Sequence, residues 1–326
     1  MTRRDMLLTI AASTVSARAA DLRAAFGTAS AVPKTGAARP GSASRADGFR
    51  GPYCLFSKLL PDLAWKDLGC AVNEAGFDGV DLTVRLKGHV LPERVATDLP
   101  RALEAIHAVG TEVPMITTGL LSADDPAAQP TFEAASNGGV RFLKPGYYRY
   151  QLEDVRRELV DAGRQLGSLA ELGRRYALVV GYHTHAGVVG GPTLDFLPEI
   201  EKLDARTVGV YFDVRHAVVE GGRVGWKLAA ALAMPRLRMI AVKDYVWEEG
   251  AKGKWRDVNC PLGEGMVDWP AFCRMLAEAD YQGPVSVHVE YDIEGATPAA
   301  RRDRALEAAR RDLALIKRHM QEAYRA

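Results

Sequence analysis

The chain has 326 residues, of which 48% are hydrophobic and 25% charged, and its formal net charge is +1. This is ordinary globular composition, long enough for one large domain or two small ones. The balanced charge argues against a nucleic-acid partner, although it leaves room for a local basic patch. No apolar run reaches the roughly 18 residues of a membrane span.

The N-terminus has the pattern of an export signal. Arg3 and Arg4 precede a weakly apolar stretch at residues 6–15, and Ala-Arg-Ala at residues 17–19 forms a plausible cleavage site. We therefore predict a twin-arginine signal over residues 1–19, and a periplasmic or exported protein. The alternative is a chance arginine pair on an amphipathic N-terminal helix.

Residues 20–50 are rich in Ala, Gly, Ser and Arg and lack apolar periodicity, which predicts a flexible linker before a single domain at residues 51–326. The chain has four cysteines without CxxC or zinc-site spacing: Cys54, Cys70, Cys260 and Cys273. An oxidising compartment would allow disulfides, and the sequence does not choose among the three pairings. A domain of this size needs no such staples, so we expect free, buried cysteines.

From residue 51 onward, short apolar runs alternate with helical patterns. Strands are predicted at residues 53–57, 79–83, 113–117, 140–144, 177–187, 208–213, 239–243 and 285–290. Helices are predicted at residues 61–75, 92–109, 151–176, 194–203, 226–233 and 269–279, and from Thr297 to the C-terminus. A short helix is expected after Pro130, and a long loop from residue 244 to Gly265.

Eight strands in strict alternation with helices predict a parallel sheet that closes into a (β/α)₈ TIM barrel. An open doubly wound sheet is the alternative, and it would be favoured by a GxGxxG turn after the first strand. Residues 56–59, Phe-Ser-Lys-Leu, do not form that motif. In barrels the reacting groups lie at the carboxyl ends of the strands, which is where polar residues follow the apolar runs here.

The fifth and sixth strands carry the strongest candidates. His183 and His185 share one face at the end of an apolar strand, which indicates metal ligands or acid–base groups, with two structural histidines as the alternative. Asp213 ends the sixth strand, and His216 follows three residues later. A carboxylate there needs a metal, a substrate or a cation, unless it caps the next helix.

Other strand ends add cations and aromatic rings. Arg85 and His89 follow the second strand, where Arg85 would bind a carboxylate or phosphate of a substrate, or a surface acid. Lys144 ends the fourth strand, ahead of Tyr147 and Tyr148, whose rings suit the apolar faces of a sugar or simply pack. We assign Arg85, His89 and Lys144, with the histidine at 216, to substrate binding.

The last two strands complete the set. Lys243 should point inward like Ala241 and pair with a neighbouring carboxylate, in a functional or a purely structural ion pair. Ser286, His288 and Glu290 share one face of the eighth strand. A histidine and a glutamate together inside a barrel are hard to explain by packing alone.

Together these strand ends resemble the xylose-isomerase-like TIM-barrel superfamily, in its group of sugar-phosphate isomerases and epimerases, over about residues 51–292. The matching segments are residues 76–82, 182–185, 212–216, 242–244, 261–265, 267–269 and 281–284. In this family a divalent metal is held by Glu, Asp, His and Glu from four strand ends.

The resemblance implies a metal site with an altered ligand set. Asp213 matches the family's Asp, while His183 and His288 stand at its two Glu positions and Ala241 at its His position. The implied ligands are therefore His183, Asp213 and His288, which suit Mn²⁺, Zn²⁺ or Co²⁺ better than Mg²⁺. Loss of the metal is the alternative.

The resemblance also implies proton abstraction next to a carbonyl, through an enediolate, on a ketose or keto-glycoside. Glu290 is the expected base, His185 or His216 the acid or oxygen-binding partner, and Lys243 a further catalytic group. The alternatives are a keto-glycoside lyase and a sugar-binding barrel that has lost catalysis. The apurinic-endonuclease branch is disfavoured by the export signal and the balanced charge. A homo-oligomer is left open.

Overall fold

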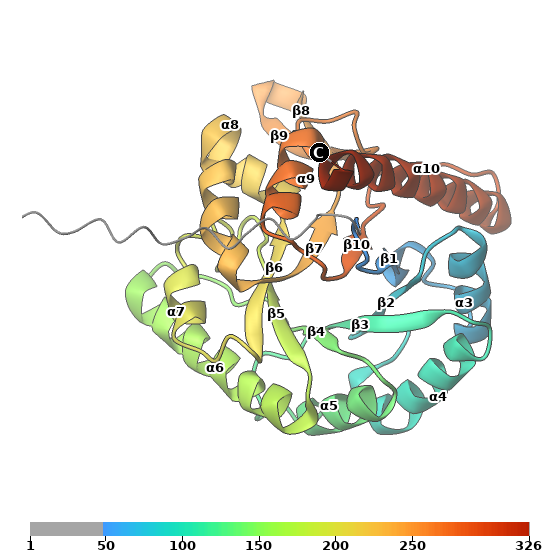
Figure 1. Ribbon diagram of the computed structural model, residues 1–326, viewed down its shortest axis with the longest axis horizontal. Helices are drawn as coiled ribbons and strands as arrows, with labels where there is room; N and C mark the ends of the chain where they lie inside the picture. Colours follow the sequence, from blue (N-terminus) through green and yellow to red (C-terminus); the bar gives the residue numbers. More distant parts are fainter. Residues whose placement is uncertain (1–47, 326) are drawn as a thin grey trace, which may run out of the picture. The chain divides into compact units, whose positions relative to one another are not determined.

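The computed structural model describes residues 48–325, so the predicted export signal at 1–19 and nearly all of the predicted linker at 20–50 lie outside the described residues. Eight parallel strands close into a barrel in the order β1-β10-β7-β6-β5-β4-β3-β2 (Figure 1). The strands are β1 (Tyr53–Phe56), β2 (Gly79–Val84), β3 (Glu112–Thr118), β4 (Phe142–Lys144), β5 (Val179–His183), β6 (Val208–Asp213), β7 (Leu237–Val242) and β10 (Val285–Val287). The predicted (β/α)₈ barrel is confirmed.

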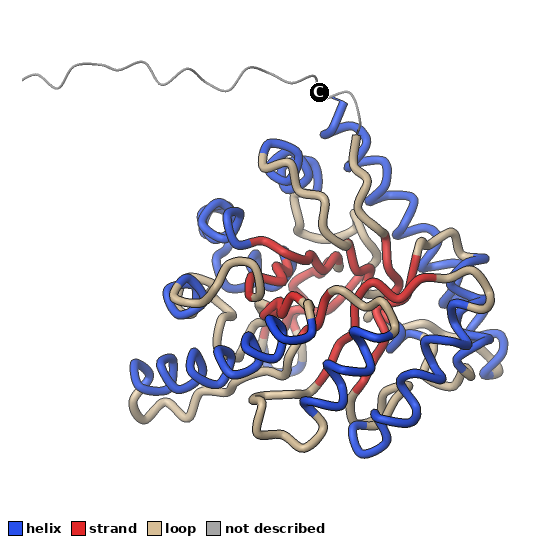
Figure 2. The backbone as a smooth tube through the Cα atoms, turned by 60° about the horizontal axis from the view of Figure 1, so that its bottom comes forward, coloured by secondary structure: helices blue, strands red, loops and turns tan. Residues whose placement is uncertain are grey.

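Helices surround the barrel, as Figure 2 shows in blue around the red strands. They are α3 (Trp65–Glu74), α4 (Val95–His107), α5 (Ala128–Asn137), α6 (Val155–Tyr176), α7 (Leu197–Glu201), α8 (Val214–Ala233), α9 (Trp269–Glu278) and α10 (Pro298–Arg325). Four short 3₁₀ turns join them: η1 (Ser57–Leu59), η2 (Pro92–Arg94), η3 (Met234–Arg236) and η4 (Ala251–Gly253). Thr297 caps α10 as predicted, because its hydroxyl accepts the Ala300 N–H. In the described residues no helix combines the length and apolar character needed to cross a bilayer.

Two segments differ from the prediction. The expected loop after the seventh strand contains an antiparallel hairpin of β8 (Asp244–Glu249) and β9 (Trp255–Cys260), because its charged residues concealed a two-residue alternation. Helix α8 begins at Val214, twelve residues before the predicted start, since Asp213 accepts the N–H of His216 and caps it. Gly222, with φ +57°, breaks this helix in the middle, and for this reason the sequence pattern predicted only its second half.

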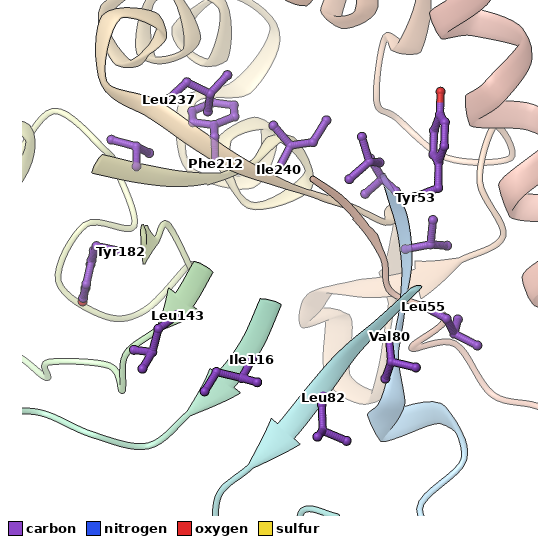
Figure 3. Close-up of a cluster of buried hydrophobic side chains, with 14 of the residues drawn as sticks. Tyr53, Leu55, Val80, Leu82, Ile116, Leu143, Tyr182, Phe212, Leu237 and Ile240 are labelled. Atoms are coloured by element: carbon purple, nitrogen blue, oxygen red, sulfur yellow. The ribbon is translucent and has the colours of Figure 1, made fainter. Parts of the chain in front are cut away.

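The strands alternate between two packing layers. Outward-facing side chains such as Leu55, Leu82 and Ile240 are buried against the surrounding helices (Figure 3). Inside, a separate apolar cluster plugs the barrel and consists of Cys54, Met115, Tyr211, Met239 and Ala241. The polar strand ends lie beyond this plug, toward the carboxyl ends of the strands. All four cysteines are free, as expected, and Cys54 and Cys273 are buried.

Candidate active site

A cavity of about 530 Å³ opens at the carboxyl ends of the strands. Its walls are formed by Lys58, His185, Ala186, Gly187, Arg215, His216, Lys243, Asp257, Asn259 and Glu290. The barrel therefore brings four of the predicted site residues to one cavity: His185, Lys243 and Glu290 follow β5, β7 and β10, and His216 lies in the first turn of α8.

Asp213 is the centre of this arrangement. Its carboxylate is fully buried, and Oδ2 lies 3.2 Å from His183 Nε2, 3.2 Å from Lys243 Nζ and 3.7 Å from His216 Nε2. Burial alone would raise the pKa of this carboxyl, but Lys243 and the two histidines hold it well below its usual value. Asp213 is thus a fixed negative charge.

Lys243 links Asp213 to Glu290. Its Nζ lies 3.0 Å from Glu290 Oε2, and on the outer side Lys58 Nζ lies 2.6 Å from Glu290 Oε1. Burial would lower the pKa of Lys243, but the two carboxylates outweigh it and raise that pKa. Burial likewise opposes ionisation of Glu290, but Lys243 and other cations hold its pKa well below the usual value. The result is a row of alternating charges across the mouth.

The imidazole of His183 is held on both sides. Its Nε2–H donates to Asp213, so Nδ1 accepts the Tyr147 hydroxyl at 2.8 Å, and the ring stacks on Tyr211 at 4.3 Å. Burial lowers the pKa of His183 to about 4. At neutral pH it is therefore an uncharged, fully engaged side chain.

His185 and His216 form a contacting pair with centroids 3.7 Å apart. His185 Nδ1–H donates to the Ala186 carbonyl at 2.9 Å, which leaves Nε2 as a free acceptor. His216 Nδ1 accepts from the Arg215 guanidinium at 3.1 Å, so Nε2 carries the proton, and it has no hydrogen-bond partner among the described residues. Burial lowers the pKa of both rings. The pair offers one acceptor and one unpaired donor.

His288 belongs to a deeper network. Ser286 donates to Asp81 at 2.8 Å, so the Ser286 oxygen accepts His288 Nε2–H at 3.1 Å, and Tyr211 lies 3.1 Å from the same nitrogen. The ring stacks on Phe56 at 4.3 Å. Nδ1 of His288 is 4.0 Å from Glu290 Oε2, beyond hydrogen-bond range. Burial raises the pKa of Asp81 to about 6.

The three remaining predicted residues lie apart from the cavity wall. Lys144 is buried with Nζ 3.5 Å from the centre of the Tyr147 ring, and burial lowers its pKa to about 7. Arg85 lines a separate cavity of about 440 Å³. Both ring nitrogens of His89 are hydrogen-bonded, to the Leu60 carbonyl and the Thr83 hydroxyl. His89 therefore stabilises the loop after β2.

The donor set does not fit the divalent metal that the family pattern implies. His183 and Asp213 are in contact, but the ammonium of Lys243 lies at the same carboxylate oxygen. His288 holds its Nε2 proton in the deeper network, and Ala241 lies in the apolar plug. Within residues 48–325 no group of three His, Cys, Asp or Glu side chains is arranged to hold a metal.

Several site residues were missed in the sequence. Lys58 follows the first strand directly, a position typical of barrel active sites. Asp81 lies within an apolar run, where a charged residue is itself a signal of function or pairing. Arg215 and Asp257 form an ion pair at 2.6 Å across the cavity, and only the unpredicted hairpin brings them together.

Comparison with known proteins identifies the barrel. The family model described as a xylose isomerase-like TIM barrel matches residues 70–319. No curated protein matches the chain. Among solved structures, an L-ribulose 3-epimerase has a TM-score of 0.64 at 16% identity, over 84% of this chain and 96% of that chain.

Two further structures are similar. A D-allulose 3-epimerase from Methylomonas sp. in complex with D-allulose has a TM-score of 0.63 at 16% identity, over 83% of this chain and 98% of that one. A 3-keto-D-glucoside 4-epimerase from E. coli has a TM-score of 0.61 at 16% identity, over 82% and 100%. At these identities the likeness establishes the fold alone.

Proposed function

The chain belongs to the xylose isomerase-like TIM-barrel family, and on that basis we propose that it is a sugar epimerase or isomerase. Its substrate is a ketose or a keto-glycoside that loses a proton from the carbon next to the carbonyl. The observation that carries this proposal is one cavity whose wall includes the Glu290 carboxylate, the Lys243 ammonium and the imidazoles of His185 and His216. The similar ketose 3-epimerases and keto-glucoside 4-epimerase support it.

Glu290 is the base in this proposal. Its carboxylate takes the carbon-bound proton, the C–H electron pair forms the enediolate, and the carbonyl oxygen becomes negative. Lys243 contacts Glu290 and lies where it can also stabilise that oxygen, and His216 Nε2–H is the unpaired donor for a second oxygen. A substrate oxygen that shares the Lys243 ammonium weakens the pairing of that ammonium with Glu290 and raises the basicity of the carboxylate.

The way the proton returns decides the product. If Glu290 returns its proton to the adjacent carbon, the product is an isomer. An epimer requires a proton from the other face. His185 follows β5, and β6 and β7 lie between β5 and the strand that precedes Glu290 in the barrel order. An imidazolium at His185 would donate the proton from Nε2, after which His185 and Glu290 reset by exchange with water. A lyase would use the same enediolate to expel a leaving group.

Deuterium wash-in followed by NMR tests this proposal on a panel of ketoses and keto-glycosides in D₂O. The wild type should exchange the hydrogen next to the carbonyl, and Glu290→Gln should slow exchange by about 10²–10⁴-fold while remaining folded. Glu264→Gln, at a side chain that is 60% exposed, is the matched control and should exchange normally.

Two outcomes would contradict it. Normal exchange in Glu290→Gln would remove Glu290 from the mechanism. Sugar binding without exchange across the panel would favour a non-catalytic sugar-binding barrel, a function consistent with the altered donor set at Ala241. Export is a separate proposal, tested by fractionating cells that express the full chain with the arginines at positions 3 and 4 intact or replaced by lysine.

A further inference from the structure

We infer that the ammonium of Lys243 takes the place of the divalent metal in this barrel, so that the site binds no resident metal ion and the lysine itself supplies the positive charge. The exclusion of the metal stands on geometry alone. The catalytic role of the ammonium rests on the proposed function.

The position of Lys243 is the first argument. Its side chain is 5% exposed, and Nζ bridges Asp213 Oδ2 at 3.2 Å and Glu290 Oε2 at 3.0 Å. These two carboxylates come from the ends of β6 and β10, and β7, which precedes Lys243, lies between those strands in the barrel. The ammonium thus occupies the point where the carboxylates of the two flanking strands converge.

The balance of charge is the second argument. Asp213 and Glu290 are matched one for one by the ammoniums of Lys243 and Lys58. A divalent ion added at Asp213 would leave two unmatched positive charges beside an ammonium in a buried site. Such charges are costly because like charges repel strongly where water does not screen them.

The state of the donor atoms beside Asp213 is the third argument. Both ring nitrogens of His183 are hydrogen-bonded, and His288 Nε2 carries a proton held by Ser286. Ala241, at the family's histidine position, offers no donor atom. His216 Nε2 is unpaired, but it carries its proton because Nδ1 accepts from Arg215. The two imidazoles beside Asp213 therefore present no free lone pair toward it, and a metal at Asp213 would also have to displace the ammonium of Lys243.

An ammonium has the capacity for the task. Lysine has three N–H donors, and the two carboxylates use two of them, which leaves one for a substrate oxygen. The charge that develops on the enediolate oxygen would be stabilised without any proton transfer from the lysine.

Metal analysis of the purified wild type is the direct test. We expect no stoichiometric metal by mass spectrometry after gel filtration, and an identical melting temperature with EDTA or with added Mn²⁺, Zn²⁺ or Co²⁺. One retained equivalent of metal, whose removal lowers the melting temperature, would overturn the inference. This readout does not require a known substrate, so a metal-free protein without exchange activity would refute only the proposed function.

A gain-of-binding variant tests the cause. Ala241→His combined with Lys243→Ala restores the family's histidine and removes the ammonium, and should bind one equivalent of Mn²⁺ or Zn²⁺ with a rise in melting temperature. Lys58→Ala is the control, because it frees the same Glu290 from its exposed side and should gain no metal. A folded double variant that binds no metal would show that these two residues do not exclude it. If the double variant does not fold, the metal content of the wild type decides.

Discussion

Replacement of Asp213 by asparagine should be among the most destabilising isosteric changes in the barrel. The carboxylate is fully buried and lies against two imidazoles and one ammonium. Asparagine keeps one carbonyl oxygen that can cap α8. Its NH₂ group cannot accept hydrogen bonds from the two imidazoles, and the ammonium of Lys243 loses the negative charge at this position. Loss of one partner from a buried ion pair costs about 3–5 kcal/mol, because the remaining charge stays desolvated.

This cost predicts a measurable shift in melting temperature. An unfolding entropy of about 2.1 cal/mol/K per residue gives about 0.6 kcal/mol/K for roughly 280 residues, so Asp213→Asn should melt about 5–9 °C lower. Asp161→Asn is the charge-matched control. Its side chain is 44% exposed and lies 3.0 Å from Arg164. An exposed pair contributes under about 1 kcal/mol, or about 2 °C here.

The acid side of the stability profile gives an independent check. The pKa of Asp213 in the folded protein lies below its ordinary value of 3.8. The advantage of the wild type over Asp213→Asn should therefore be complete above pH 3.8 and be lost as the pH falls through the folded pKa. Equal melting temperatures for the two asparagine variants at pH 7 would refute the buried-charge reasoning.

Three further changes follow from other buried groups. Lys144→Met should stabilise the protein at pH 7 by up to about 4 kcal/mol, because burial lowers the Lys144 pKa from 10.5 to about 7. A lower melting temperature of the variant would contradict this. Asp81→Asn should become more stable than the wild type as the pH rises from about 4 to 6, by up to about 3 kcal/mol. The reason is that the pKa of Asp81 in the folded protein, about 6, exceeds its ordinary value of 3.8. A difference in the free energy of urea unfolding that does not change with pH would disprove this. Asp244→Ala should lower the free energy of unfolding in urea by at least about 3 kcal/mol. The substitution leaves the Trp269 indole N–H and the backbone N–H groups of Gly263 and Val267 without their acceptor. A loss below about 1 kcal/mol would mean that water replaces the carboxylate.

The fold could be predicted because its signals are local. Each strand is a short apolar run, most helices have a side-chain cap or a glycine stop, and eight repeats of this unit close a barrel. The two-residue alternation of a strand also indicates which side chains share the inner face, as for Ser286, His288 and Glu290. The hairpin was missed because charged residues such as Glu248 and Arg256 alternate with its apolar ones.

The contacts within the site could not be predicted, because they depend on how neighbouring strands are staggered. His288 and Glu290 lie two residues apart on one face, yet His288 joins the deeper network of Tyr211 and Ser286 while Glu290 reaches Lys243. The sequence pattern placed His288 with His183 as a ligand. The two ring centroids lie 6.0 Å apart, and the ammonium of Lys243 lies at Asp213 beside them.

The stagger also explains why residues 241 and 243 are coupled. Asp213 and Ala241 are register partners on adjacent strands, and Lys243 follows Ala241 on the same face. A histidine at 241 would direct its ring into the space beside Asp213 that the Lys243 ammonium now fills. For this reason Ala241→His alone should crowd Lys243 and destabilise the barrel, and the added loss of the lysine should restore stability when metal is supplied, a non-additivity that a double-mutant cycle with and without Mn²⁺ would measure.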